Sequence, residues 1–551
     1  MDRDFLNDTL SQISDKYILE ANIPKKKALL PWLSVAACLI LVISLGILLS
    51  GSPADSPTAG FPATQPLIQG NPTLSATEPL MQGNPTLSAT EPPMQEDPTL
   101  PITEPSVQDP PTSPVTEPEP SLPPATTPPV QTGKVTLLAD PSLPVLSAFP
   151  TDQSNFSQWQ QAHKKWQADR TALHSAPEGY ADTLTDFWKK SIPLYLSDAN
   201  GTNTAYSPIS LYMALSMLAQ TAGGQSQQEI LDLLGANSME YLAQQAQTIF
   251  KNHYENDGVH TAIMANSLWL NDSYSFLPDA AAKLADIFYA SVYQGALESP
   301  EMNDALRDWL NAQTGGLLQD SIGGLRDMDA LTAMVIASTI HYRCKWLHEF
   351  IPEQNTRDIF QAVSGEKTVT FMNTTLGNSA YYAGNGFCAV SLPLDDGSKM
   401  WLILPDEGIS PEELLAGGKA LDFLFNKDLA EKRQLDINLS LPKFDIVSDL
   451  QLTDGLKAMG IQALYDPLLA DFSGIAEGNQ GMCLGGATQG VRVTIDEVGL
   501  TGVAYTVIEV PGVDMPPPDV QEIDFVLDRP FLFFVESSDG LPLFTGIVNN
   551  P

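Results

Sequence analysis

Apolar positions after residue 180 follow two spacings, and each predicts one kind of secondary structure. Short apolar runs, continuous or alternating with polar residues, predict β-strands at residues 266–271, 334–342, 387–394, 399–405, 435–444 and 530–535. Apolar residues three or four positions apart predict helices at residues 207–220 and 450–460. Because helices come early in this region and strands later, the pattern favours an α+β fold with large antiparallel sheets.

A bridging segment, residues 134–179, precedes this region and carries aromatic residues at helical spacing. The residues that share one helical face are Phe156, Trp159, His163, Trp166 and Arg170. We therefore expect an N-terminal extension whose helix docks on the main domain.

An uncharged apolar run at residues 28–50 is long enough to cross the roughly 30 Å hydrocarbon layer as a helix. Lysines precede the run and acidic sequence follows it, which predicts that residues 1–27 are cytoplasmic and that the rest is extracellular. A cleaved signal peptide, with Ser50 or Ser52 near the cleavage point, is the alternative. The run is longer than the usual apolar core of such peptides, about 7 to 15 residues, which favours a membrane anchor.

Residues 51–133 are rich in Pro, Thr and Ser, and the unit QGNPTLSATEP begins at Gln69 and again at Gln82. The unit has too few aliphatic residues to stack as a folded repeat. It therefore predicts an extended linker between the span and the extension. The main domain then covers residues 180–551.

The overall charge excludes one class of partner. The chain carries 66 acidic and 28 basic residues, for a net charge of −38. Nucleic-acid affinity depends on Lys and Arg that displace counterions, so we expect no nucleic-acid partner.

Residue types that often carry catalysis are sparse. There are six histidines and no HExxH, GxSxG or phosphate-binding loop motif, so we expect no enzymatic site, no metal and no cofactor. Beyond the apolar run, Cys344, Cys388 and Cys483 have no CxxC spacing and are interpreted as small buried core residues. Asp395 and Asp396 fall in a turn and are interpreted as solvated.

Residues 493–528 lack any Lys or Arg. Their first half is filled with Val, Ile, Ala, Gly and Thr, which is strand chemistry, whereas residues 516–518 are three prolines, which no interior strand tolerates. The segment could form a strand, yet it is attached to residues that cannot.

The order of landmarks along the main domain resembles that of the serpin family. Residues 203–235, which contain SPISLYMALSMLAQ, resemble the serpin opening, a strand that turns into a buried helix. Further blocks match in order at residues 265–271, 309–318, 337–360, 402–408, 441–446, 470–475, 494–499, 529–535 and 543–551. The resemblance implies a serpin fold with three β-sheets, about nine helices and an exposed reactive-centre loop.

In inhibitory serpins a protease cleaves this loop, which then inserts into the main sheet as a new strand and traps the acylated protease. By resemblance, the hinge of the loop comprises Glu497, Gly499, Leu500, Thr501, Gly502, Val503, Ala504, Tyr505 and Thr506. An inserted strand alternates between a buried and a solvated face. We expect the inward positions to be Leu500, Gly502, Ala504, Thr506, Ile508 and Val510.

By resemblance, the seventeenth residue from Glu497, Val513, gives Val513–Asp514 as the expected reactive-site bond. The loop is about six residues longer than is common, which leaves cleavage anywhere from Glu509 to Met515 open. A loop without Lys or Arg does not suit a trypsin-like protease. We therefore expect an extracellular elastase-like or subtilisin-like serine protease as the partner.

Other positions carried over from the family belong to the region where the sheet opens. They are Ser207, Ser210, Ser338, Gln489 and Trp346. Ser338 stands where the family usually has Asn and Gln489 where it usually has His, so we expect the hydrogen bonds of this region to differ. Trp346 matches the tryptophan at the end of the sheet where the loop begins to enter.

The hinge also departs from the inhibitory pattern, because Leu500 replaces a usual Thr and Tyr505 is bulky. The sequence therefore leaves two functions open. One is a membrane-tethered, extracellular inhibitor on a bacterial cell, monomeric but able to form loop-sheet polymers; the other is a non-inhibitory serpin that serves as a surface binding or adhesion module.

Overall fold

The computed structural model describes residues 134–551, except 153, 198–200, 317–326, 329–331, 479–480, 486 and 501–520. The predicted cytoplasmic segment, membrane span and linker lie outside the described residues. So do hinge residues Thr501, Gly502, Val503, Ala504, Tyr505 and Thr506, and the expected reactive-site residues Val513 and Asp514. In the part of the chain that is described, no helix is long and apolar enough to cross a membrane.

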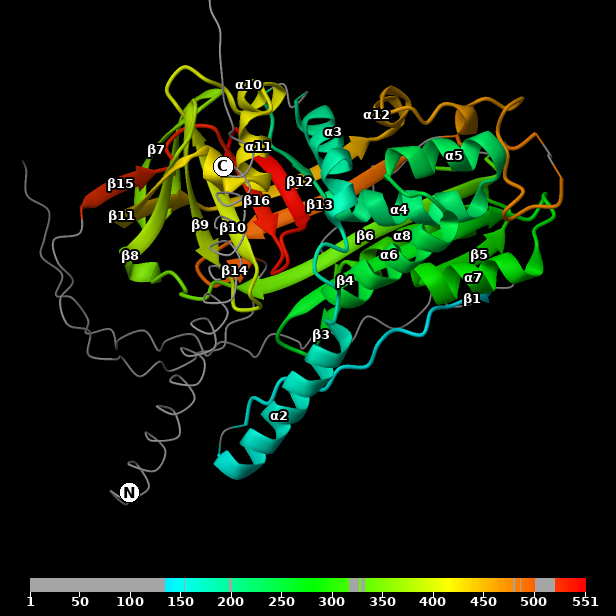
Figure 1. The fold of residues 1–551 in the computed structure, drawn as a ribbon, viewed down its shortest axis with the longest axis horizontal. Coiled ribbons are helices and arrows are strands. Elements are labelled where there is room, and N and C mark those ends of the chain that lie inside the picture. The colour runs from blue at the N-terminus through cyan, green and yellow to red at the C-terminus, as the bar shows by residue number, and fades with distance from the viewer. Residues whose placement is uncertain are drawn as a thin grey trace, which may run out of the picture. The chain divides into compact units, whose positions relative to one another are not determined.

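The first sheet contains eight strands in the order β1-β5-β4-β6-β14-β13-β12, with β3 beside β4 (Figure 1). Their bounds are β1 Thr136–Ala139, β3 Glu255–Asn256, β4 Thr261–Asn271, β5 Ala290–Gly295, β6 Met334–Lys345, β12 Phe444–Gln451, β13 Thr488–Ile495 and β14 Gly499–Leu500. Strand β1 belongs to the extension and pairs antiparallel with β5 at the edge of the sheet.

The second sheet contains nine strands in the order β15-β11-β8-β9-β10-β16-β17-β2, with β7 beside β8. Their bounds are β2 Thr204–Tyr206, β7 Thr356–Ala362, β8 Gly365–Ala383, β9 Phe387–Pro393, β10 Lys399–Pro405, β11 Glu431–Pro442, β15 Glu522–Val526, β16 Phe531–Glu536 and β17 Pro542–Val548. The resemblance implies three sheets, whereas the ladders of the described residues form two. The reason is that the long strand β8 pairs with β7 and β11 and, at its end, with β9, which makes the ladder continuous.

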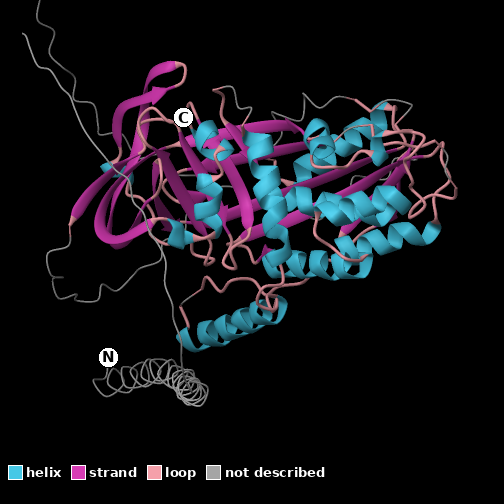
Figure 2. Cartoon of the chain, turned by 45° about the horizontal axis from the view of Figure 1, so that its top comes forward, coloured by secondary structure: helices cyan, strands magenta, loops and turns pink. Residues whose placement is uncertain are grey.

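Ten α-helices lie within the described residues, nine of them after residue 180 (Figure 2). Their bounds are α2 Phe156–Leu173, α3 Thr185–Leu196, α4 Pro208–Thr221, α5 Gly224–Leu233, α6 Met239–His253, α7 Pro278–Phe288, α8 Pro300–Gln313, α10 Pro411–Ala416, α11 Lys419–Phe425 and α12 Thr453–Ala458. Short 3-10 helices cover Asp182–Leu184, Pro352–Gln354, Lys427–Leu429 and Ala463–Tyr465.

The predicted strands and helices are present, with two corrections. The run predicted as one strand at residues 435–444 is divided between β11, which ends at Pro442, and β12, which begins at Phe444 in the other sheet. The helix expected at residues 450–460 is only α12, because Leu450 and Gln451 pair with Gln489 and Thr488 and thus extend β12. Helix α4 begins where the sequence predicts, because the Ser207 side chain caps it by accepting a hydrogen bond from Ser210 N and a proline opens its first turn.

The largest core cluster contains buried side chains from both sheets and from α3 and α4, Trp188, Tyr212 and Phe531 among them. A smaller cluster lies around β4, β5 and α8 and includes Trp269 and Trp309. Val135 of the extension is buried in this second cluster, so the extension contributes to the core of the domain.

Candidate functional site

The chain reverses direction after β13 in a turn built around Asp496. One oxygen of its carboxylate accepts hydrogen bonds from the backbone N–H groups of Val498, at 2.9 Å, and Gly499, at 3.1 Å. The turn returns the chain into the sheet as β14, where Gly499 pairs with Lys345 and Leu500 pairs with both Cys344 and Ile495. Leu500 is only 3% exposed, so the first of the expected inward residues already lies in the sheet.

Gly499 is required by close approach to β6. A Cβ atom at this position would lie 2.2 Å from Cys344 O and 2.7 Å from Lys345 Cα, which is far inside van der Waals contact. The hinge therefore needs a residue without a side chain where it crosses the end of β6.

Trp346 and Glu497 stabilise the turn through hydrogen bonds and an ion pair. The buried indole of Trp346 donates to Asp496 O at 2.8 Å, and its backbone N–H donates to Val498 O at 2.9 Å. Glu497 forms an ion pair with Lys443 and accepts a hydrogen bond from Asn355. Partial burial raises the pKa of Glu497, but these two partners outweigh it and hold the pKa below its ordinary value.

Beyond Leu500, β6 and β13 are neighbours in the sheet without being paired, and we call this unpaired boundary the gap. Within the described residues no backbone ladder joins these two strands directly, and the sheet order passes from one to the other only through the two residues of β14. Along β13, Ile495, Val493, Val491 and Gln489 are buried, whereas the residues between them are more exposed. The edge of β13 thus has the alternation that a paired strand needs.

The polar residues expected where the sheet opens do lie together, at the N-terminus of α4. Gln489 accepts from Ser207 N and donates to Ser207 O, each at 3.0 Å, while Ser207 Oγ donates to Leu543 O at 2.8 Å. On the other side of the gap, Ser338 Oγ donates to Ser210 O at 3.1 Å. The start of α4 therefore connects β6 to β13 beneath the gap. Trp346 stands apart from this cluster, at the hinge.

The extension docks on the β3–β4 hairpin through buried charges, which sequence reasoning missed. Trp166 Nε1 donates to Asp257 Oδ2 at 2.8 Å, and Arg170 forms an ion pair with Glu255. Burial raises the pKa of Glu255 to about 7 despite the opposing effect of Arg170. The helical spacing of Trp166 and Arg170 predicted docking, but nothing in the sequence indicated its partners.

His260 lies at the centre of this charged cluster. Its Nδ1 is 3.0 Å from Asp257 Oδ2, and its Nε2 is 3.2 Å from Asp395 Oδ2, an ion-pair distance without hydrogen-bond alignment. Burial lowers the pKa of His260, but the two carboxylates outweigh it and raise the pKa to about 10. Asp395 is an exposed turn residue, as interpreted, but its side chain is only 26% exposed and also faces His260, which the sequence did not indicate.

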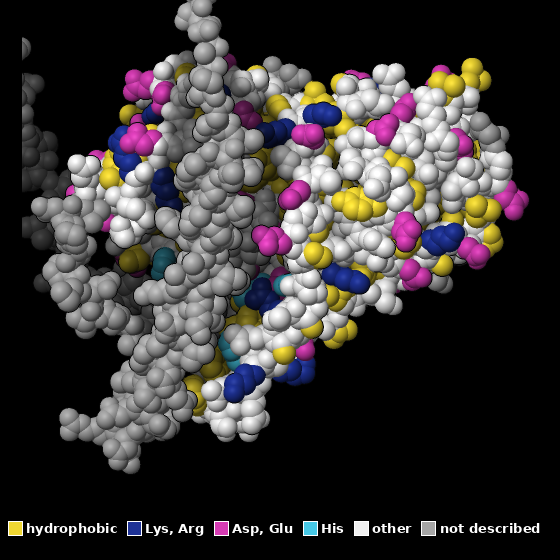
Figure 3. Space-filling view, in the orientation of Figure 1, with side chains coloured by type: hydrophobic (Ala, Val, Ile, Leu, Met, Phe, Trp, Pro, Cys, Tyr) yellow, Lys and Arg dark blue, Asp and Glu magenta, His cyan; other side chains and the backbone are white. Residues whose placement is uncertain are grey.

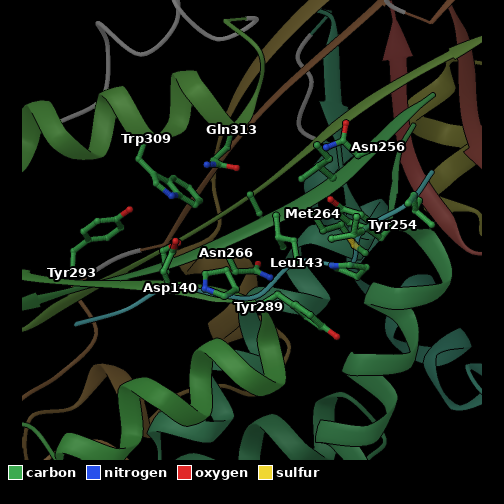
Figure 4. Close-up of a pocket in the computed structure, with 17 residues that line it drawn as sticks. Asp140, Leu143, Tyr254, Asn256, Met264, Asn266, Tyr289, Tyr293, Trp309 and Gln313 are labelled. Carbon is green, nitrogen blue, oxygen red and sulfur yellow. The ribbon is translucent and has the colours of Figure 1, made fainter. Parts of the chain in front are cut away.

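A cavity of about 370 Å³ lies between the extension and the first sheet (Figure 4). Residues 140–146 form one wall, and β4, β5 and the end of α8 form the others; Asp140 is the one charged residue in the lining. The lining of the cavity includes no residue of β6 or β13, and it contains no cluster of ionisable groups.

No group of three His, Cys, Asp or Glu side chains in the described ranges could hold a metal ion. The three cysteines are free, but only Cys344 is fully buried; Cys388 and Cys483 are half-buried, which corrects the interpretation of all three as core residues. On the uncovered part of the face in Figure 3, basic side chains are interspersed with acidic ones, so that part carries no continuous basic track.

Known proteins resemble the chain over its main domain. The family model for serpins, serine protease inhibitors, matches residues 186–551. Serpin-Z1A of Triticum aestivum is 26% identical over 364 residues, which cover 64% of this chain and 90% of that protein. An uncharacterised serpin-like protein of Thermococcus kodakarensis is 25% identical over 368 residues, which cover 64% of this chain and 82% of that protein.

Solved structures share the fold. Tengpin, a thermophilic serpin in its native state, superposes with a TM-score of 0.60 at 24% identity, over 68% of this chain and 95% of tengpin. Thyroxine-binding globulin in complex with thyroxine gives a TM-score of 0.57 at 23% identity, over 67% of this chain and 99% of that one. The family model matches most of the sequence, and the hinge turn and the gap beyond it agree with that match. The chain therefore belongs to the serpin family.

Proposed function

We propose that this serpin is an extracellular, membrane-tethered inhibitor of serine proteases that acts as a suicide substrate. The observation that carries the proposal is the position of Leu500, which is already paired inside the first sheet at the start of a gap that is otherwise without ladder bonds. After cleavage the loop could extend β14 along this gap once β6 and β13 part, because the described residues form no ladder between these two strands.

The register of β14 supports the expected inward residues. If the antiparallel ladder continued from Leu500, Gly502 would face Val493, Ala504 would face Val491 and Thr506 would face Gln489. Each of these β13 residues is buried, so the small or neutral loop residues would share their buried face. On the other edge, Thr506 would face Ser338.

Insertion would release considerable free energy. At about 1 kcal/mol for each net hydrogen bond, a strand of ten residues bonded on both edges would contribute on the order of 10 kcal/mol, with apolar burial in addition. The uncleaved serpin would then be metastable, because a loop tied at both ends cannot enter the gap fully.

The expected partner follows from the loop. Cleavage at Val513–Asp514, in a segment without Lys or Arg, favours an elastase-like or subtilisin-like protease. The apolar run at residues 28–50 and the linker at residues 51–133 would hold the domain outside the cell, at some distance from the membrane.

A gel assay tests inhibition directly. Residues 134–551 are mixed with elastase or with subtilisin, boiled in detergent and separated by size. Inhibition predicts a covalent complex with the mass of serpin fragment plus protease. Cleavage of the loop without a complex, and with no gain in thermal stability of the cleaved protein, would contradict inhibition and favour the binding or adhesion module.

A further inference from the structure

A continuous set of polar contacts, buried around Asp257 and His260 and partly exposed at Asp395, leads from the extension into the main domain. It begins at the Trp166 indole on α2, which donates to Asp257 at 2.8 Å. Asp257 lies 3.0 Å from His260 and also accepts the backbone N–H of His260 at 2.7 Å. Phe149 of the extension packs edge-on against both the Trp166 and His260 rings, so the extension covers this part of the cluster.

The same contacts continue to the end of β6. His260 is 3.2 Å from Asp395, whose other oxygen accepts from Cys344 Sγ at 2.9 Å and from Lys345 N at 3.2 Å. The backbone N–H of Asp395 donates to Lys345 O at 3.0 Å. These two β6 residues are the ones that β14 pairs with.

The burial of these charges makes their positions interdependent. The Asp257 side chain is 0% exposed and that of His260 is 6% exposed, so each ion depends on its partners instead of on water. Removing one member leaves a buried charge uncompensated, which costs far more than the loss of a surface ion pair. A change at the extension therefore has an energetic route to Asp395 and to the end of β6.

We propose that His260 and Asp395 are positioning residues that couple docking of α2 to the pairing of β14 with β6. The extension thereby regulates how readily the reactive-centre loop starts to insert. This consequence for insertion rests on the proposed inhibitory function, whereas the coupling between α2 and β14 does not.

Hydrogen–deuterium exchange in the full chain tests the coupling itself. Trp166→Phe keeps a buried ring but removes the N–H that binds Asp257, and Asp395→Asn removes the charge that faces His260. We expect amide exchange across β14 and at Cys344 and Lys345 to accelerate about threefold for the first variant and about tenfold for the second.

The matched control is Trp159→Phe, the same replacement on the same helix. The Trp159 indole donates to Pro150 O, within the extension, and so lies off the path to β14. Exchange at β14 should be as slow in this variant as in the unmodified protein. Equal exchange at β14 in all four proteins would overturn the proposal, and so would an acceleration in Trp159→Phe as large as in Trp166→Phe.

A second measurement concerns regulation of the loop. The number of serpin molecules consumed per protease molecule trapped should rise about threefold or more for Asp395→Asn and stay unchanged for Trp159→Phe. An altered exchange at β14 in a protein that traps no protease would refute inhibition and leave the coupling intact. Inhibition with unaltered exchange would refute the coupling alone.

Discussion

Gln489→Leu isolates the contribution of the polar cluster that lies beneath the gap. Gln489 is 4% exposed and makes both of its hydrogen bonds to the backbone of Ser207, which is itself 0% exposed. Leucine has a similar volume, so the change removes hydrogen bonds without leaving a large cavity.

The structure supplies the magnitude. The N–H of Ser207 loses its partner in a place that water does not reach, and an unsatisfied buried group costs about 1–3 kcal/mol. The C=O of Ser207 still accepts a hydrogen bond from Leu211 N, so the native state should be destabilised by about 1–3 kcal/mol in total. Because these bonds hold β13 to the start of α4, the loss should also ease separation of β13 from β6.

Urea-induced unfolding, followed by tryptophan fluorescence, measures the destabilisation, and native gels after mild heating detect head-to-tail polymers. We expect Gln489→Leu to unfold faster than the unmodified protein and to polymerise at a lower temperature. The control is Gln434→Leu, at an exposed position of β11. If the two variants unfolded in urea and polymerised on heating alike, the idea that the polar cluster holds β6 and β13 together would be refuted.

Three further predictions concern the hinge, the loop and the buried histidine. Gly499→Ala should displace β14 and destabilise the fold by about 1–3 kcal/mol in urea unfolding, because its Cβ would overlap the backbone of β6; unchanged stability would contradict that contact. Thr506→Arg should turn the inhibitor into a substrate in the gel assay, because the charge would enter a buried face. The control, Val507→Arg, should still trap protease. If the two variants inhibited equally well, the expected alternation of buried and solvated loop residues would be contradicted. His260 holds its proton more tightly folded than unfolded, with a pKa of about 10 against 6.5, so its contribution is present below about pH 6.5 and is lost as pH rises through 10. Between pH 6.5 and 10 the His260→Gln variant should therefore lose less thermal stability than the unmodified protein. An equal loss in both proteins would show that a group other than His260 titrates.

Local patterns were sufficient to predict most of the strands and the helix at residues 156–170, although Phe156 on its expected docking face is 64% exposed. Leu500, the first residue expected to point inward, is buried, whereas the other expected inward residues lie outside the described residues. Alternation and short-range spacing carry this information, because each depends on neighbours a few residues away.

Contacts between distant parts of the chain could not be predicted in the same way. Strand β1 is four residues long and exists because the edge of β5 is available to it. Asp395 was interpreted as solvated because its turn looks polar, and nothing in the sequence indicated its contact with His260, which lies far from it in the chain. The continuous second sheet likewise depends on the pairing of β8 with strands on both sides.

The crystal structure of the protein cleaved at its loop tests the central claim most directly. Loop insertion predicts that residues 501–510 form a strand between β6 and β13, continuing the register of β14 and placing Thr506 between Ser338 and Gln489. A cleaved protein in which the gap still ends at Leu500, with residues 501–510 outside the sheet, would contradict the account.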